Sequence, residues 1–303
     1  MIAIFEQVLI LITFCLAGYV LCKAKLLGPE HCKPLSVLLI YVFFHLMSFK
    51  IFSVQFTVAY LESKGLMMLV SVALIPVVGF IARVISKFLG GDQYQQDVNM
   101  YSMSVPNIGY MGYPLAEAVY GATGMMDCMM FGLPMTMYIN TYCYNMLTAG
   151  KVKKSIWSQI FTPSMIGILV GCMVGIIGWK VPETLMDIAQ MGNNCVAPVS
   201  MLLTGMALSE FSIKELLKNK KVYVVCAIRL IAVPLLVWAL VKLCGLQFAL
   251  LPTVILYAMP CGMNTIVFPK LVDKDCRSGA AIVLVSTVIS LITIPLCLSF
   301  LLG

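Results

Sequence analysis

The chain has 303 residues, of which 61% are hydrophobic and only 11% are charged, and its mean hydropathy is +0.99. Soluble globular proteins carry roughly 25% charged residues, so this composition excludes them and indicates an all-α protein that crosses a lipid bilayer many times. The formal net charge of +7 does not indicate a nucleic-acid partner, because the basic residues fall in short runs between apolar segments.

Ten apolar segments follow one another along the chain, and each is close to the roughly 20 residues that a membrane-spanning helix needs. They cover residues 4–22, 34–52, 66–89, 98–120, 125–149, 160–179, 185–208, 222–243, 248–271 and 279–302. The first segment is expected to stay in the protein rather than to be cleaved as a signal peptide, because Glu6 lies at its start and its basic residues follow it. The sequence therefore predicts a polytopic protein with ten transmembrane helices.

Basic residues are unevenly divided between the connections. Most lie after the odd-numbered segments, and the alternate connections hold only Lys50, Lys64, Lys180 and Lys242. Because lysine and arginine are enriched on the cytoplasmic side of a membrane, this alternation predicts a multi-pass protein of the cell membrane with both termini outside.

The two halves of the chain carry a weak internal repeat. Ten segments divide into five and five, and an odd number in each half gives the halves opposite orientation. Prolines recur in the same order in both halves: Pro76 with Pro234, Pro106 with Pro260, and Pro134 with Pro295. These features predict a 5+5 inverted repeat.

The fourth and ninth segments are interrupted at matching places. Pro106, Gly109 and Gly112 interrupt the fourth, and Pro260 and Gly262 interrupt the ninth. A proline removes a backbone donor, and an unsatisfied backbone group in hydrocarbon costs several kcal/mol, so such breaks persist only inside protein or beside a watery cavity. Broken helices at matching positions of two halves predict the binding site of a transporter.

The residues beside the two breaks suit an anion. The N-terminal end of a half-helix carries partial positive charge, which stabilises a carboxylate. Asn107 and Asn264 can donate to the same carboxylate from their amides, and Thr265 follows directly. A kink that only shapes packing is the alternative interpretation, but two symmetric breaks with adjacent Asn and Gly favour a substrate site.

Three further polar residues leave alternatives open. Arg229 in the eighth segment either pairs with a carboxylate substrate or replaces a coupling cation, or else extends to the cytoplasmic interface. Asn193 and Asn194 in the seventh segment either face the substrate from a scaffold wall or mark the start of a helix.

Other polar residues are expected to serve the structure alone. Glu6 and Glu117 lie near the outer ends of their segments and are expected in solvent. Asn140 and Asn145 in the fifth segment are expected to form hydrogen bonds between helices. No aspartate within a segment stands out as a proton carrier, so the coupling ion, Na⁺ or H⁺ or none, stays open.

The cysteines and histidines indicate no metal site and no disulfide. The 12 cysteines are scattered singly without a C-x-x-C pair, and the two histidines are His31 and His45. The 22 methionines form no compact cluster with Cys or His. No nucleophile motif or phosphate loop stands out, so the sequence predicts neither an enzyme nor a bound cofactor.

The residues that follow the first break resemble a known family. Residues 107–115 read Asn-Ile-Gly-Tyr-Met-Gly-Tyr-Pro-Leu, close to the N-x-G-x-x-G-x-P-L pattern in the fourth helix of the auxin efflux carrier family. Other matching positions follow in later segments: Thr162-Pro163, Pro198, Gly205, Arg229, Pro234, Ala258-Met259-Pro260, Ser286-Thr287 and Pro295. The likeness covers essentially the whole chain, which most resembles the bacterial malate and malonate permeases of that family.

The resemblance implies a fold similar to that of the bile-acid:sodium symporters. A scaffold domain would comprise residues 1–62 and 151–218. A mobile transport domain would comprise residues 63–150 and 219–303, and the two broken helices would cross inside it. Family members tend to dimerise through the scaffold. They carry organic anions, namely dicarboxylates such as malate or malonate in bacteria and auxin in plants.

One position departs from the plant members of the family. They have Asn-Pro-Asn at the crossing, where this chain reads Val105-Pro106-Asn107. The resemblance thus implies a secondary transporter of small organic anions, with Val105 weighing against auxin itself. Two other functions stay open, a membrane sensor or regulator that keeps the fold without transport, and an anion channel.

Overall fold

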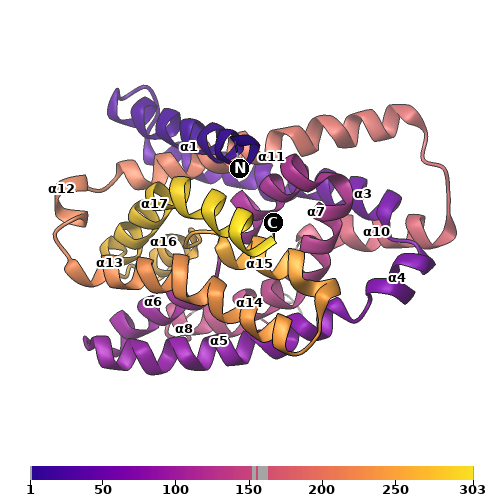
Figure 1. Ribbon diagram of the computed structural model, residues 1–303. Coiled ribbons are helices and arrows are strands. Elements are labelled where there is room, and N and C mark those ends of the chain that lie inside the picture. Colours follow the sequence, from indigo (N-terminus) through magenta and orange to yellow (C-terminus); the bar gives the residue numbers. More distant parts are fainter. Residues whose placement is uncertain (1, 152–154, 156–162, 303) are drawn as a thin grey trace.

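The computed structural model describes residues 2–151, 155 and 163–302, and these residues are almost entirely helical (Figure 1). The helices of the first half are α1 (Ile2–Lys23), α2 (Cys32–Leu38), α3 (Phe44–Gln55), α4 (Val58–Lys64), α5 (Met67–Leu89), α6 (Gln93–Ser104), α7 (Tyr113–Tyr138) and α8 (Tyr144–Leu147). Those of the second half are α10 (Pro163–Ile177), α11 (Glu183–Ser209), α12 (Ile213–Leu216), α13 (Lys220–Ala227), α14 (Val233–Leu243), α15 (Leu250–Ala258), α16 (Asn264–Lys270) and α17 (Arg277–Leu302). The described residues form no β-sheet.

Several of these helices continue through wider, π-helical turns. These turns are Leu39–Phe43 between α2 and α3, Ile108–Gly112 before α7, Ile139–Cys143 between α7 and α8, and Ile228–Ala232 between α13 and α14. Short 3-10 turns lie at Pro29–His31 and Gln247–Ala249. The pairs α2–α3 and α13–α14 therefore each act as one long helix.

Five helical runs are long and apolar enough to cross a membrane: Ile2–Lys23, Cys32–Gln55, Met67–Leu89, Lys220–Leu243 and Arg277–Leu302. They agree with the first, second, third, eighth and tenth predicted segments to within three residues at each end. Helix α11 covers the seventh segment, and the shorter apolar helices Met165–Ile177 and Gln247–Ala258 fall in the sixth and ninth. The start of the sixth segment, including Thr162, lies outside the described residues.

Helix α5 illustrates why such helices need a bilayer. Its inner face holds Val78 and Ala82, which are buried, whereas Phe80 and Phe88 are 71% and 87% exposed. Water would penalise large apolar side chains at that exposure, but lipid tails accept them. The composition had indicated an all-helical membrane protein, and the described helices confirm it.

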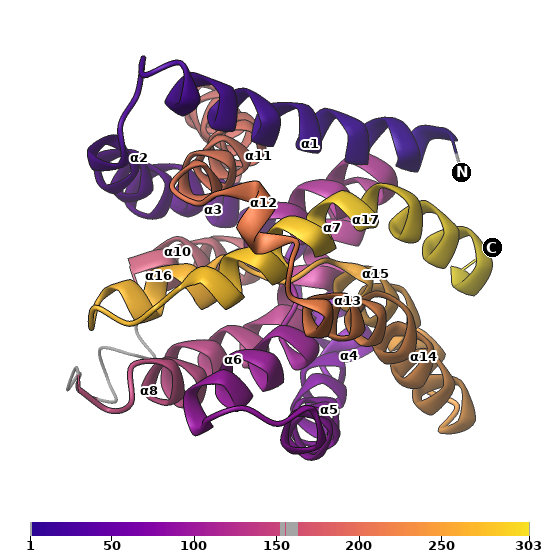
Figure 2. The same ribbon diagram turned by 90° about the vertical axis from the view of Figure 1, so that its left-hand side faces the viewer.

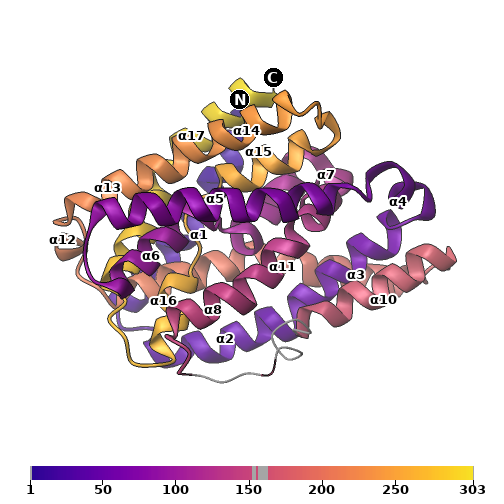
Figure 3. The same ribbon diagram turned by 90° about the horizontal axis from the view of Figure 1, so that it is seen from below.

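The helices pack in two groups that are visible in Figure 2. Helix α1 packs along α11, and α3 packs against α10 and α11. In Figure 2, α1, α2, α3 and α11 lie in the upper part, whereas α5, α6 and α8 lie in the lower part. Seen from below, α5 runs across the molecule with α6 and α8 near it (Figure 3). The start of α1 and the end of α17 lie at the same side of the molecule (Figure 2).

Small residues allow the helices of the upper group to approach closely. A Cβ atom at Gly205 on α11 would lie 1.8 Å from the carbonyl oxygen of Cys15 on α1. A Cβ atom at Gly175 on α10 would lie 2.4 Å from the carbonyl oxygen of Phe56, directly after α3. Backbones that approach closely at small residues are typical of helix pairs inside membranes.

The interruptions predicted at Pro106 and Pro260 are both present. Helix α6 ends at Ser104, and residues 105–107 are not helical before the π-helical turn begins at Ile108. Helix α15 ends at Ala258, and α16 begins at Asn264. The predicted boundary between the fourth and fifth segments is a kink within α7 at Gly121, whose φ of 70° favours glycine.

Candidate functional site

The two interrupted segments meet each other. Pro106 and Cys261 form an isolated antiparallel bridge, and the Asn107 N–H donates to the Pro260 carbonyl oxygen at 2.8 Å. The Ser286 hydroxyl on α17 accepts from the Cys261 N–H at 3.1 Å. Backbone groups released by the prolines therefore find partners across the crossing, which a break buried in a membrane protein requires.

Arg229 holds the ends of the helices that run into the crossing. Its side chain is fully buried, and its Nε donates to the Met259 carbonyl oxygen at 3.0 Å. Its Nη1 donates to Met103 at 3.2 Å and its Nη2 donates to Tyr257 at 2.9 Å, again at carbonyl oxygens. The interpretation that Arg229 extends to the cytoplasmic interface is wrong, because the carbonyls left open where α6 and α15 end bind its guanidinium instead.

A cavity of about 190 Å³ lies beside the crossing. Most of its wall is aromatic or carries methionine and other apolar groups, and Asn107, Asn140 and Asn264 contribute amides. Among the described residues that line it, none is charged. Five of the other lining residues come from α3 and α10, namely Phe44, Met47, Ser48, Met165 and Ile168. The rest come from the end of α6, the crossing, and α7 with its flanking turns: Tyr101, Pro106, Ile108, Gly109, Tyr110, Tyr113, Met129, Leu133, Thr136, Ile139, Gly262 and Met263.

The two asparagines of the predicted site differ in their bonding. Asn264 donates from Nδ2 to the Tyr101 hydroxyl at 3.1 Å, so its amide is held in place. Asn107 is 7% exposed and lines the cavity at the start of the helical run that continues into α7. The first turn of a helix has N–H groups without acceptors in the helix; here the Asn107 N–H donates to Pro260 and the Ile108 N–H donates to Pro106, at their carbonyl oxygens.

Of the glycines and the threonine of the predicted site, some line the first cavity and others lie behind it. Gly109 and Gly262 line the cavity, and a Cβ atom at Gly109 would lie 3.4 Å from the Phe44 ring. Gly112 lies outside the lining, where a Cβ atom would come within 2.9 Å of Leu256 on α15. Thr265 is fully buried and donates to the Gly262 carbonyl oxygen at 3.3 Å. Both Gly112 and Thr265 therefore shape the crossing from behind the cavity.

A second cavity, of about 480 Å³, lies between α1, α7 and α11. Asn193 and Asn194 line this cavity and not the first. Asn193 donates to Glu117 Oε2 at 2.8 Å, and the Lys50 ammonium donates to Glu117 Oε1 at 2.6 Å. The expectation that Glu117 is simply solvated is wrong, because each oxygen of its carboxylate, although 25% of the side chain is exposed, accepts from a side chain of α3 or α11. Glu6, in contrast, is exposed as expected.

Asn140 and Asn145 were expected to form hydrogen bonds between helices, but the structure places both elsewhere. Asn140 lines the first cavity, so it is available to a ligand there. Asn145 is exposed and does not lie between helices.

Sequence reasoning missed Asp127, which lies within the fifth predicted segment. Its carboxylate is buried on α7, where it accepts from the Tyr60 hydroxyl at 2.9 Å and pairs with the Lys64 ammonium. Lys64 and Tyr60 belong to α4, some 63 and 67 residues earlier in the chain. Only the presence of an acidic residue in an apolar segment pointed to this group, and nothing local identified its partners.

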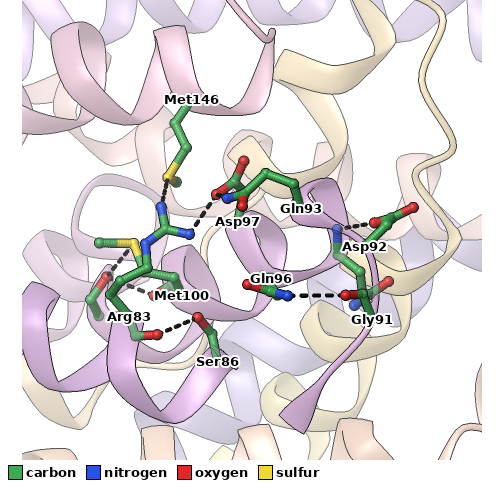
Figure 4. Close-up of polar contacts among 11 residues, drawn as sticks. Arg83, Ser86, Gly91, Asp92, Gln93, Gln96, Asp97, Met100 and Met146 are labelled. Carbon is green, nitrogen blue, oxygen red and sulfur yellow. Dashed lines mark hydrogen bonds and ion pairs between the residues drawn. The ribbon is translucent and has the colours of Figure 1, made fainter. Parts of the chain in front are cut away.

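A further buried carboxylate lies between α5 and α6. Arg83 Nη1 donates to Asp97 Oδ1 at 2.6 Å, and Gln93 Nε2 donates to the same oxygen at 2.9 Å (Figure 4). Arg83 Nη2 also lies 3.0 Å from the Met146 sulfur. Helix α6 begins at Gln93, five residues before the predicted fourth segment, which brings Asp97 into the helix.

The chain matches the family described as membrane transport protein over residues 3–298. The chain belongs to this membrane transport protein family. The match confirms the resemblance to the auxin efflux carriers, and it makes the protein a multi-pass membrane transporter and not an enzyme.

Two membrane transport proteins of archaea are similar to the chain over nearly its whole length. An uncharacterized transporter of Methanocaldococcus jannaschii is 25% identical, with 96% of each chain covered. An uncharacterized transporter of Methanothermobacter thermautotrophicus is 23% identical, also with 96% of each chain covered. Neither name specifies a substrate.

Proposed function

We propose that this membrane transport protein is a secondary active transporter of small organic anions that works by alternating access. The observation that supports this best is that the C-terminal and N-terminal ends of the half-helices at the crossing have different partners. Arg229 occupies the carbonyls at the negative ends of α6 and α15, while the start of the helical run at Ile108 borders the cavity. The remaining backbone potential in the cavity is therefore positive, which favours an anion.

Carboxylates such as malate, malonate or auxin-like acids are the proposed substrates. The amides of Asn107, Asn140 and Asn264 line the cavity and can donate to carboxylate oxygens. The aromatic and methionine side chains around them suit the apolar part of a small acid. Val105, in place of an asparagine, removes one further donor from the crossing and weighs against auxin itself.

The proposed architecture has ten spans in a 5+5 inverted repeat, with both termini outside the cell membrane. Residues 1–62 and 151–218 form the scaffold, and residues 63–150 and 219–303 form the transport domain. The cavity supports this division, because Phe44 and Met165 border it from the proposed scaffold and the crossing borders it from the other side. An elevator-like movement of the transport domain would carry the crossing past these residues. We further propose a homodimer formed through the scaffold.

Arg229 also bears on the coupling ion. Unwound carbonyls and the C-terminal ends of half-helices coordinate cations in other transporters with broken helices. Here the Arg229 guanidinium already donates to three such carbonyls. We therefore propose that no sodium ion binds between α6 and α15, and that any coupling ion, Na⁺ or H⁺, binds elsewhere.

Uptake into liposomes tests the proposal. We expect saturable uptake of labelled malate, malonate or a monocarboxylate, and a rise of about ten-fold in the apparent KM for Asn107→Ala and for Asn264→Ala, as loss of a hydrogen bond to a charged group predicts. Asn145→Ala, at an exposed position on the same helical run as Asn140, is the matched control. Binding without flux would identify a sensor, and flux that does not saturate would identify a channel.

A further inference from the structure

The two cavities beside α3 share one side chain. Met47 lines both the cavity at the crossing and the cavity between α1, α7 and α11, and it alone does so among the residues described around either. It is only 2% exposed, so its side chain is closely packed although it borders both cavities. Methionine is long, unbranched and flexible, which allows it to close a gap without blocking it rigidly.

The opposite wall between the cavities comes from the start of α7. Tyr110 and Tyr113 line the first cavity, and Pro114 and Leu115 line the second. Leu115 is 1% exposed. Met47 and residues 113–115 are therefore the places where the linings of the two cavities adjoin, and their side chains are mainly apolar. An apolar constriction excludes water even where the cavities on both sides are wet.

The second cavity has the character of a hydrated space. Glu117 lines it and is 25% exposed, and Asn193, which also lines it, donates to the Glu117 carboxylate. The ion-pair partner of Glu117, Lys50, is 15% exposed. Asn194 and Gln190 pair at 2.7 Å on the same wall. Charges inside a membrane protein usually face the bundle interior or a water-filled cavity. Because Lys50 balances Glu117, the cavity carries no net charge from this pair that would repel an anion.

The orientation expected from the charge pattern assigns the two cavities to opposite sides of the membrane. The second is lined by residues between 7 and 14 of α1 and between 190 and 198 of α11, in the early and middle turns of these helices. The first is lined from the start of α10, by Met165, and from Asn140 late in the run that begins with α7. The charge pattern assigns the beginnings of α1 and α11 to the outer face of the membrane. It assigns the beginning of α10 to the cytoplasmic face.

We propose that the second cavity is the outer arm of the permeation path and that Met47 is the barrier that closes it from the substrate cavity in this conformation. This inference rests on the proposed transport of organic anions. The anion would pass between the two cavities only when the wall at residues 113–115 moves away from Met47.

The test is a leak measurement that needs no substrate. The full-length protein is placed in liposomes that contain a chloride-sensitive dye, and chloride entry is followed with no carboxylate present. We expect Met47→Ala to raise chloride entry about five-fold or more, because water and small ions then pass the opened constriction. Met47→Leu, which keeps the apolar bulk, is expected to stay as tight as the unchanged protein.

Two further variants keep the result interpretable. Met201→Ala removes an equally buried methionine from α11 that lines neither cavity, and it is expected to leave chloride entry unchanged. Met47→Gln adds a polar group of nearly the same size, so it wets the barrier without a void and is expected to leak if Met47→Ala does not fold. If neither Met47→Ala nor Met47→Gln leaks more than Met201→Ala in folded protein, the barrier assignment is overturned. Failure of carboxylate uptake in the unchanged protein would instead overturn the proposed function and leave the leak result standing.

Discussion

Arg229 and Lys50 are both basic residues inside membrane-spanning helices, yet their surroundings differ in kind. Arg229 is fully buried and donates to backbone carbonyls that belong to the two interrupted segments. Lys50 is 15% exposed and pairs with the Glu117 carboxylate beside a cavity. Water can replace a partner of Lys50, but nothing inside the crossing can replace the donors of Arg229. The first cation therefore holds the buried crossing together, and the second lies at a partly exposed contact between α3 and α7.

The difference between Arg229 and Lys50 predicts that contacts of charged residues in this molecule matter more for stability the more deeply they are buried. Exposed ion pairs contribute little to stability because water screens them, whereas a buried group that loses its partner keeps the full cost of its desolvation. Four tests along this order examine the comparison. Three measure the change in the thermal unfolding midpoint in detergent, and the test of Lys50 and Glu117 measures a coupling energy with a double-mutant cycle.

The largest effect is expected for Arg229→Met. Methionine fills much of the space but leaves the carbonyls of Met103, Tyr257 and Met259 without donors, at about 1–3 kcal/mol for each. We expect a steep fall in the midpoint or loss of folded protein. Arg229→Lys retains the charge with fewer fixed donors. Its unfolding midpoint is expected to lie between those of the unchanged protein and Arg229→Met. A midpoint unchanged in Arg229→Met would show that the crossing does not depend on this side chain.

A smaller but clear fall in the unfolding midpoint is expected for Asp127→Asn. The carboxylate is buried, but its partner Lys64 is 30% exposed and can turn to water, which reduces the cost to about 2 kcal/mol. Tyr60→Phe removes only the hydrogen bond of 2.9 Å and serves as the control, at about 1 kcal/mol. Equal midpoints for the two variants would contradict a stabilising Lys64–Asp127 pair.

A coupling energy of about 1 kcal/mol is expected between Lys50 and Glu117, as for partly exposed ion pairs. The single variants Lys50→Gln and Glu117→Gln, with the double variant, complete the cycle that measures it. Each glutamine keeps a polar group beside Asn193, so the neighbouring hydrogen bond has a partner. A coupling as large as the loss in Arg229→Met would remove the distinction between the two cations.

The smallest effect is expected for Asp275→Asn in the connection before α17. The Arg277 guanidinium donates to Asp275 and holds the pKa of that carboxyl below its ordinary value. A lowered pKa means that the contribution is present at neutral pH and is lost as the pH falls through the lowered pKa. Both side chains are more than half exposed, so the midpoint at neutral pH should not change measurably. A clear drop would show that burial does not order these contacts.

The sequence was sufficient for the features that depend on neighbouring residues. The apolar length of each segment and the prolines inside it are local properties, and they located Cys32–Gln55, Lys220–Leu243 and the interruptions at Pro106 and Pro260. Asn107 and Gly109 were singled out for the same reason, since they follow a break directly, and both line the first cavity.

Predictions about charged residues failed where the partner lies far along the chain. Glu117 was expected in solvent because it lies near the end of an apolar segment, but Lys50, 67 residues away, holds it. Arg229 was left with open alternatives, and one of its acceptors lies 126 residues away. Asp127 was overlooked because its partners on α4 belong to a different segment.

The sequence by itself determined that this protein is a helical membrane protein with two interrupted helices. Hydrocarbon tolerates only long apolar helices, and proline interrupts a helix wherever it occurs. The tertiary structure alone decided that the two interruptions meet, that Arg229 joins them, and that Met47 lines two cavities. Those facts depend on which helix faces which, and in a bilayer apolar faces of nearly equal hydrophobicity can pack in many ways until close contacts and buried hydrogen bonds select one.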